Sequence, residues 1–217
     1  MKKSYLSWSI LGVSLVLTLN SCVQTEDTTV ITENKPVVET IADLVSGSEN
    51  FRKSPNGVVY QEKFSNQSIK DPSNPAAFPG FGVGNSTYIG KSLSYFNQYA
   101  TGMPDSEGKV TTVAAPVTEY FSDQISALGL DVNDINAKTP LVSTLTADGK
   151  GNSIWFHNVL NNAQFDQDGN ISFEAQVEIV GGTGVFANAT GTGTVIGNVN
   201  GLDGKGTTVL KAEINFN

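Results

Sequence analysis

The stretch that decides the fold is residues 171–201, ISFEAQVEIVGGTGVFANATGTGTVIGNVNG. From Ile171 to Ile179 every odd position is apolar and every even position is polar, which is the two-residue period of a half-buried strand. Glycines at 181, 182 and 184 then turn the chain, because glycine adopts positive φ at little cost. Residues 190–199, rich in threonine, return as a second strand whose glycines are typical of a curved sheet. The stretch therefore predicts a glycine-rich β-hairpin.

The same stretch imitates a nucleotide-binding loop. Gly182, Gly184 and Ala187 follow a strand with the spacing of the dinucleotide fingerprint, and Asp203 lies about twenty residues farther on. That fingerprint needs a helix directly after the glycines. Residues 188–194 consist largely of glycine and threonine, which are poor helix formers. We therefore predict a hairpin here, and a helix opening at Gly182 would contradict the prediction.

Strand patterns recur along the rest of the chain. Eight segments show them: 57–64, 87–99, 109–115, 140–147, 152–160, 171–180, 190–199 and 207–216. Asp-Gly pairs at 148, 168 and 203 lie between neighbouring strands and are typical of hairpin turns. The chain is therefore predicted to be all-β, an antiparallel barrel of about eight strands whose interior is filled by side chains or holds one small ligand.

Residues 177–194 resemble the GGTGxFxxAxGxG hairpin of the allene oxide cyclase-like and dirigent-like β-barrel proteins. Residues 82–91, GVGNSTYIGK, resemble the first hairpin of bacterial relatives, and residues 146–154 add a third piece in the same order. The resemblance covers residues 57–217. It implies a calycin-like barrel that confines a hydrophobic molecule, and assembly as a homo-oligomer, commonly a trimer.

Two segments interrupt the strands. Residues 65–84 contain three prolines and are predicted to form a long loop. Residues 118–128 are predicted to form a short helix, because Phe121, Ile125 and Leu128 share one face and Gly129 can end it. This helix would either close one mouth of the barrel or cover a sheet edge.

The N-terminus predicts export. Lys2 and Lys3 precede an apolar core at 6–19, shorter than the roughly 20 residues that span a bilayer, so residues 1–21 read as a signal peptide. Leu19-Asn-Ser-Cys22 resembles the lipobox of bacterial lipoproteins, and Cys22 is the only cysteine. We predict that Cys22 is lipidated and anchors the protein to the membrane. An ordinary signal peptide with an incidental cysteine is the alternative.

The predicted organisation is a signal peptide at 1–21, a lipidated flexible tether at 22–50 and a β-barrel domain at 51–217. The predicted location is the bacterial cell envelope, at the outer membrane. The formal net charge is −8, and removing Lys2 and Lys3 with the signal peptide makes the mature chain more acidic. Such a surface argues against nucleic acid as a partner.

The sequence predicts no metal site and no cofactor. His157 is the only histidine, so a zinc site of several histidines is excluded, and a structural role is expected for it. Residues 166–170, DQDGN, begin like a calcium loop. They lack the glycine at the sixth position and the acid at the twelfth, and therefore predict a hairpin turn.

Glu62 is the candidate catalytic residue. In residues 57–64 the even positions place Tyr60, Glu62 and Phe64 on one face, which in a barrel is the lumen. Loss of water there would raise the pKa of the carboxyl group, which could then bind a polar ligand end or transfer protons. A register error, or a Glu62 that reaches solvent, is the alternative. Tyr60, Tyr95 and Phe173 are further ligand-binding candidates unless they are ordinary core.

Three functions remain open. The first is a non-enzymatic, membrane-anchored barrel that binds a small apolar ligand or a protein partner. The second, implied by the resemblance, is an isomerase or cyclase of the allene oxide cyclase type acting on a hydrophobic substrate. The third is a structural or adhesive role at the cell surface. A lumen filled by aromatic side chains would exclude the first two in their ligand-binding form.

Overall fold

The computed structural model describes residues 57–216, so the predicted signal peptide and tether lie outside the described residues. Its strands are β1 Val58–Ser68, β2 Gly80–Ser86, β3 Gly90–Phe96, β4 Gln98–Ala100, β5 Lys109–Ala114, β6 Thr144–Ala147, β7 Ser153–Phe165, β8 Ile171–Thr183, β9 Thr190–Val199 and β10 Lys205–Asn215. Its helices are α2 Thr118–Ala127, α3 Val132–Asn136 and the 3₁₀ turn η2 Gly184–Phe186. Within this range no helix has the length and apolar character that crossing a bilayer requires.

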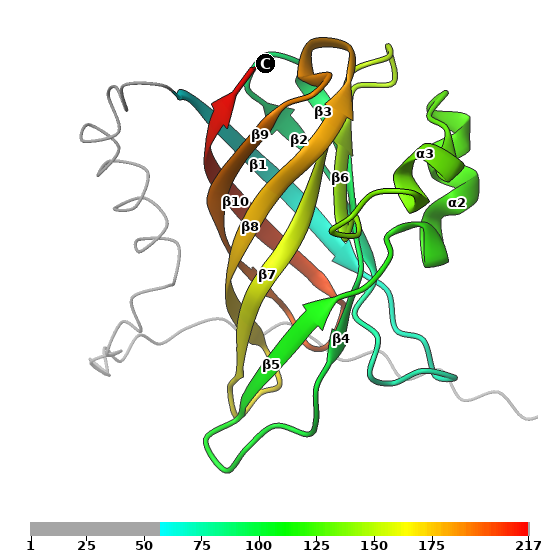
Figure 1. Cartoon of the computed structure of the whole chain (residues 1–217). Coiled ribbons are helices and arrows are strands. Elements are labelled where there is room, and N and C mark those ends of the chain that lie inside the picture. The colour runs from blue at the N-terminus through cyan, green and yellow to red at the C-terminus, as the bar shows by residue number, and fades with distance from the viewer. Residues whose placement is uncertain (1–56, 217) are drawn as a thin grey trace, which may run out of the picture. The chain divides into compact units, whose positions relative to one another are not determined.

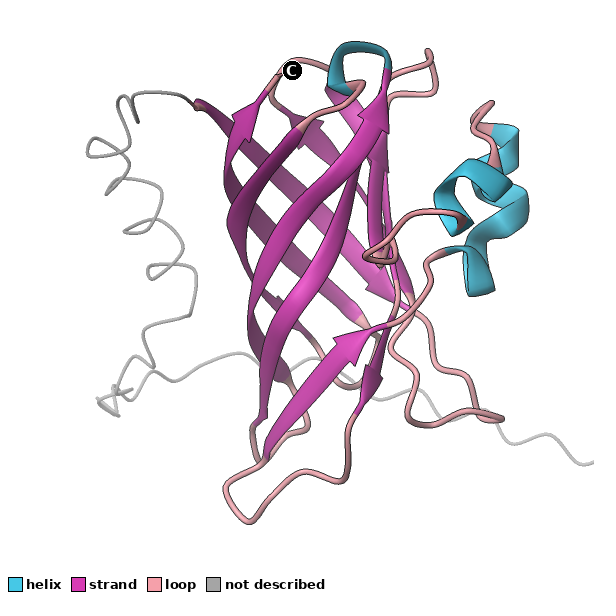
Figure 2. Cartoon of the chain, viewed as in Figure 1, coloured by secondary structure: helices cyan, strands magenta, loops and turns pink. Residues whose placement is uncertain are grey.

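The strands form one antiparallel sheet that closes into a barrel (Figure 1, Figure 2). Its order is β4-β5-β7-β6-β3-β2-β1-β10-β9-β8, and β8 pairs back onto β7. Eight strands make the closed ring, from β7 through β6, β3, β2, β1, β10 and β9 to β8. The predicted eight-stranded antiparallel barrel is confirmed.

The hairpin predicted from residues 171–201 is present. β8 and β9 pair from Ile171↔Val199 to Ile179↔Gly191. Gly182 lies within β8, and the three-residue turn η2 follows it, where a nucleotide-binding loop would open an α-helix. The dinucleotide reading is therefore excluded by the local structure.

Strands β5 and β6 share one position in the barrel. β6 pairs with the first part of β7, with Thr144 opposite Phe156, and β5 pairs with its last part, with Thr112 opposite Asn161. At the junction the Asn97 N–H donates to the carbonyl of Ser143, and the Asn97 carbonyl accepts from the N–H of Ala115. The chain thus leaves the sheet at Ala115 and re-enters it at Ser143, and the residues between form α2 and α3.

The two helices pack on the outer wall of the barrel. Phe121 and Ile125 of α2 and Ile135 of α3 are buried in an apolar cluster with outward-facing residues of the sheet, which include Tyr95, Leu145 and Trp155. Figure 1 shows both helices beside the barrel. The helix predicted at 118–128 is confirmed. Of the two predicted roles, closing a barrel mouth is wrong, because the apolar face of α2 packs on the outer wall.

A second apolar cluster fills one end of the lumen. Phe186 of η2 is fully buried there, and its ring lies 5.6 Å from that of Tyr60 and 6.2 Å from that of Phe216. Figure 1 shows this end beside the C-terminus. The β8–β9 turn therefore plugs the barrel at this end with an aromatic side chain.

The sequence pattern did not predict strand β2. β1 continues to Ser68 and β2 begins at Gly80, so the loop spans 69–79 instead of 65–84, and a turn at 87–89 precedes β3. The predicted strand at 87–99 is likewise divided into β3 and β4. β2 escaped detection because Gly80, Gly82 and Gly84 occupy its inward positions, and glycine leaves no apolar side chain for the two-residue pattern.

Gly182 is expected to be essential to the hairpin. A Cβ at this position would lie 2.2 Å from the carbonyl oxygen of Ser153 and 2.7 Å from Cβ of Phe186. Gly182→Ala should therefore lower the free energy of unfolding by roughly 2 kcal/mol, the cost of overpacking. Gly102 has no atom within 4 Å of such a Cβ, so Gly102→Ala is the matched control and should be neutral or slightly stabilising. Urea denaturation measures both, and equal effects would contradict the packing argument.

Candidate functional site

The part of the lumen away from Phe186 contains a cavity of about 100 Å³. It reaches the ends of the strands, where Ser68, Phe165 and Ile171 line it. One wall, from β8, β9 and β10, is apolar except for Thr208 and includes Ile171, Phe173, Ala175, Val177, Val195, Val199 and Leu210. The rest of the lining mixes the polar residues Ser94, Gln98, Thr112, Thr144, Asn158 and Asn161 with the apolar residues Phe64, Phe78, Phe96, Phe156, Ala163 and Phe165. The lumen is therefore filled at one end and hollow at the other.

Glycines help to leave this space. Gly82 and Gly84 are the inward positions of β2 opposite Phe64 and Asn66 of β1. A Cβ at Gly82 would lie 2.3 Å from Oδ1 of Asn66. At these positions β2 adds only backbone to the lumen. The side chains of Phe64 and Asn66 on β1 lie over the β2 backbone.

Glu62 borders the cavity next to the packed end. Its side chain is 4% exposed, and the Tyr60 hydroxyl donates a hydrogen bond of 2.5 Å to Oε1. Burial raises the pKa of Glu62 to about 7, and the hydroxyls of Tyr60 and Thr146 offset part of that rise. Burial also raises the pKa of Tyr60, which therefore keeps its proton and remains a donor. The predicted lumenal position of Glu62 is confirmed, and its chemical role stays a prediction.

A second polar group lies farther along the cavity. Nδ2 of Asn161 donates to Oγ1 of Thr112 at 2.8 Å and also to Oε1 of Gln98, which accepts from the Thr112 hydroxyl as well. These bonds occupy the amide nitrogen of Asn161 and leave its Oδ1 without a partner. Oδ1 of Asn158 also has no hydrogen-bond partner. Each such buried oxygen costs about 1–3 kcal/mol, which a donor on a ligand would recover.

A β-bulge in β7 brings Asn158 and Asn161 to the same wall. The register against β8 shifts between Asn158 and Leu160, so Val159 is an extra residue on β7. Without it, two residues three apart in a strand would point to opposite faces. Sequence reasoning missed Asn161 because the predicted strand ended at residue 160, and it did not single out Asn158. The local signal was the break in alternation at Val159-Leu160, both of which are exposed.

The other ligand-binding candidates are divided among three environments. Phe173 lines the cavity, as expected. Tyr60 lies in the packed cluster beside Glu62. The expectation that Tyr95 faces the lumen is wrong: its ring packs 5.0 Å from that of Phe121 on the outer wall. Ser94 and Phe96 take the inward positions of β3, so alternation turns Tyr95 outward.

The residues considered for metal or triad chemistry have structural contacts. Nδ1 of His157 lies 2.9 Å from the Leu141 carbonyl and ties β7 to the helical insertion. Oδ1 of Asp166 accepts from the N–H groups of Asp168 and Asn170 and shapes the predicted hairpin turn. Over residues 57–216, three or more histidine, cysteine, aspartate or glutamate side chains do not come together in a metal-binding arrangement.

Comparison with known proteins adds little to this picture. No protein-family model matches the chain, and no curated protein matches it. Among solved structures it is similar to a pterocarpan synthase dirigent protein, with 12% identity, a TM-score of 0.23, and coverage of 75% of this chain and 87% of that chain. The fold assignment rests on the strand pairing described above.

Stability should depend on pH through Glu62. Its pKa is about 7 in the folded chain and near 4.5 without burial, so between these values the folded chain binds more protons than the unfolded chain. The free energy of unfolding should therefore fall by about 3 kcal/mol as pH rises from 4.5 to above 7. Glu62→Gln should remove this fall. Denaturant titrations across pH measure it, and a Glu62→Gln variant that keeps the full pH dependence would show that the carboxyl group is not buried.

Proposed function

We propose that this protein is a lipid-anchored protein of the bacterial cell envelope whose barrel binds a small, mostly apolar ligand in its lumen. The observation that carries the proposal is a mostly apolar cavity whose lining includes Glu62 and the unpartnered amide oxygens of Asn158 and Asn161. Ligand sites in proteins have this composition, in which apolar area supplies affinity and a few polar groups fix orientation. Plugging by Phe186 at one end leaves entry from the end formed by the 69–79 loop and the 166–170 turn.

The envelope part of the proposal rests on the sequence. The apolar core at 6–19 and the lipobox-like Leu19-Asn-Ser-Cys22 support export and lipidation, and the acidic tether residues Glu26 and Asp27 suit an exposed position. An outer-membrane location belongs to the same proposal. Several acyl chains on Cys22 would hold the barrel at the membrane while leaving its lumen accessible.

An isomerase or cyclase acting on a hydrophobic substrate is the second candidate. One observation favours it: Glu62, with a pKa of about 7, borders the cavity and is hydrogen-bonded to the Tyr60 hydroxyl. A carboxyl group with this pKa exchanges protons efficiently near neutral pH, and the apolar wall would exclude water from a reactive substrate. Binding without turnover is the simpler proposal, because Glu62 is the one ionisable side chain among the described residues that line the cavity.

Filling the cavity should abolish ligand binding. Ala175 is buried on the apolar wall, so Ala175→Phe places a ring in the space that a ligand would occupy. Native mass spectrometry of chain purified without detergent should detect a bound hydrophobic molecule on the unaltered barrel and at least tenfold less on the variant. Ala187→Phe, at an exposed position after η2, is the matched control and should keep the ligand. Equal occupancy of both variants would refute lumenal binding.

Lipidation should depend on Cys22. Cells grown with radiolabelled palmitate should incorporate the label into the unaltered protein and fail to do so for Cys22→Ser. The variant should also move from the membrane fraction to the soluble fraction, because one sulfur carries the anchor. Replacement of Ser21 by Ala keeps a small residue before Cys22 and serves as the control. Label retained in Cys22→Ser would contradict the predicted anchor.

A further inference from the structure

The cavity contains a carboxyl group without a cationic partner. Glu62 is the single ionisable side chain among the described residues that line it. Its register partners on the flanking strands are Ser86 on β2 and Leu210 on β10, and the cavity-lining residues Ser94 on β3, Thr144 on β6 and Asn158 on β7 carry no charge. Tyr60 is the other titratable group that faces it.

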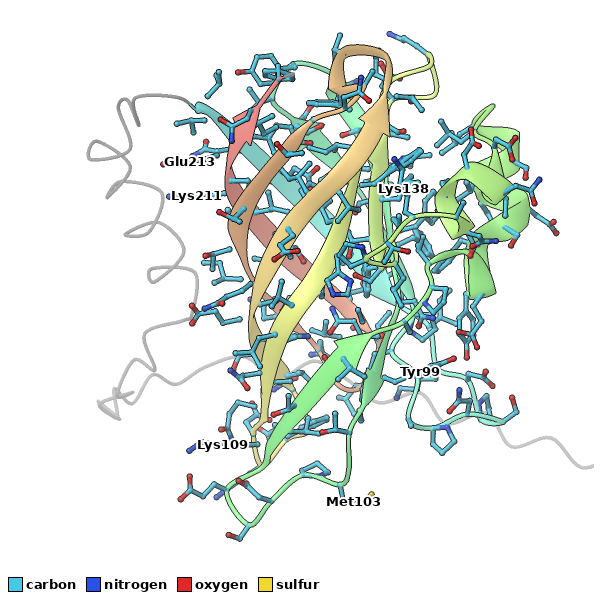
Figure 3. The ribbon with its side chains drawn as sticks, in the orientation of Figure 1. Tyr99, Met103, Lys109, Lys138, Lys211 and Glu213 are labelled. Carbon is cyan, nitrogen blue, oxygen red and sulfur yellow. The ribbon has the colours of Figure 1, made fainter. Side chains whose placement is uncertain are left out.

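Cationic side chains on the neighbouring strands point the other way. Lys63 follows Glu62 on β1, and Lys211 follows Leu210 on β10, so alternation places both on the outer face. Figure 3 shows Lys211 together with Glu213 outside the barrel. A buried carboxylate is normally paired with a cation, because taking the charge out of water is costly. The described residues supply only hydroxyl groups to Glu62.

Two unpartnered amide oxygens belong to residues that line the same cavity as Glu62. They are Oδ1 of Asn158 and Oδ1 of Asn161, and both residues are 6% exposed. Thr146 is fully buried and does not line the cavity, and its hydroxyl group lowers the pKa of Glu62. The cavity thus offers one carboxyl group and two amide acceptors to an occupant.

We propose that the ligand is an amphipathic primary amine. Its protonated nitrogen pairs with Glu62 and donates to the oxygen of Asn158, while its apolar body lies against the wall formed by β8, β9 and β10. An ammonium group carries three donors and no acceptor, which matches a carboxylate flanked by unpartnered oxygens. This inference rests on the proposed lumenal binding and names the chemical class that the lumen selects.

Charge then decides between ligands of equal size. In the poorly hydrated lumen an ammonium–carboxylate pair is stronger than it is in water, whereas an alcohol gains only ordinary hydrogen bonds. A carboxylic acid of the same length would bring a second negative charge to Glu62 and should bind worst. A ligand series that differs only in its polar group therefore separates amine recognition from simple apolar binding.

The test is isothermal titration calorimetry on the chain from Val23 onward, which retains every strand of the closed sheet. The probes are hexylamine, hexan-1-ol and hexanoic acid, which share one apolar chain. At pH 8.5 hexylamine should bind at least tenfold more tightly than hexan-1-ol, and hexanoic acid should bind most weakly. At pH 5.5 the affinity for hexylamine should fall about 30-fold, because most Glu62 is then protonated, whereas that for hexan-1-ol should not change.

Two variants test whether Glu62 and Asn158 cause the preference for hexylamine over hexan-1-ol. Glu62→Gln should abolish the preference for hexylamine over hexan-1-ol, and Glu178→Gln, the same change at an exposed position of β8, should retain it. Asn158→Leu keeps the carboxylate and removes one acceptor, so it should weaken hexylamine binding about fivefold, the effect of one hydrogen bond. This second variant keeps the test valid if Glu62→Gln does not fold.

Equal affinities for hexylamine and hexan-1-ol at pH 8.5, or tightest binding of hexanoic acid, would overturn the amine assignment and leave the proposed lumenal binding standing. Binding of none of the three probes would overturn both. A preference for hexylamine that survives Glu62→Gln would also overturn the assignment, because the charge would then lie elsewhere.

Discussion

Pairing between β7 and β8 is the interaction on which the rest of the structure depends. Both strands are 13 residues long, and their ladder runs from Ser153↔Thr183 to Phe165↔Ile171 with two register shifts. Once this ladder closes the sheet, the ring has no free edge, and alternation along every strand sends one set of side chains to the lumen and the other outward. Position along a strand then decides which residues line the cavity.

Closure also explains how the barrel carries a helical insertion without losing its core. Asn97 bridges the point where the chain leaves and re-enters the sheet, so the ladder continues across the gap between β5 and β6. The adjoining part of β7 is apolar on both faces: Trp155 packs outward under the helices, whereas Ile154 and Phe156 pack inward. One strand therefore serves two cores, and α2 and α3 stabilise the outer wall while the lumen stays free of them.

Several polar groups in the lumen lower the stability of the barrel. An apolar residue at position 62 would avoid a cost of about 3 kcal/mol at neutral pH, a substantial part of the roughly 5–15 kcal/mol that stabilises a typical domain. The unpartnered oxygens of Asn158 and Asn161 add to that cost. Unsatisfied groups are common at functional sites, and two of the four unpartnered buried atoms among the described residues belong to Asn158 and Asn161, which line the cavity.

The sequence by itself determined what depends on local periodicity. Alternation and glycine turns in residues 171–201 predicted the hairpin and the all-β class, the 3.6-residue pattern at 118–128 predicted α2, and alternation in β1 placed Glu62 on the lumenal face.

The tertiary structure decided what depends on pairing between distant segments. The sequence pattern did not reveal β2 because glycines occupy its inward positions. β2 is a strand because it pairs with β1 on one side and β3 on the other. The shared position of β5 and β6 and the outer location of α2 depend on contacts across the insertion. The bulge at Val159 brings Asn158 and Asn161 to the cavity. It is visible only when β7 is paired with β8, because Val159 has no partner residue on β8.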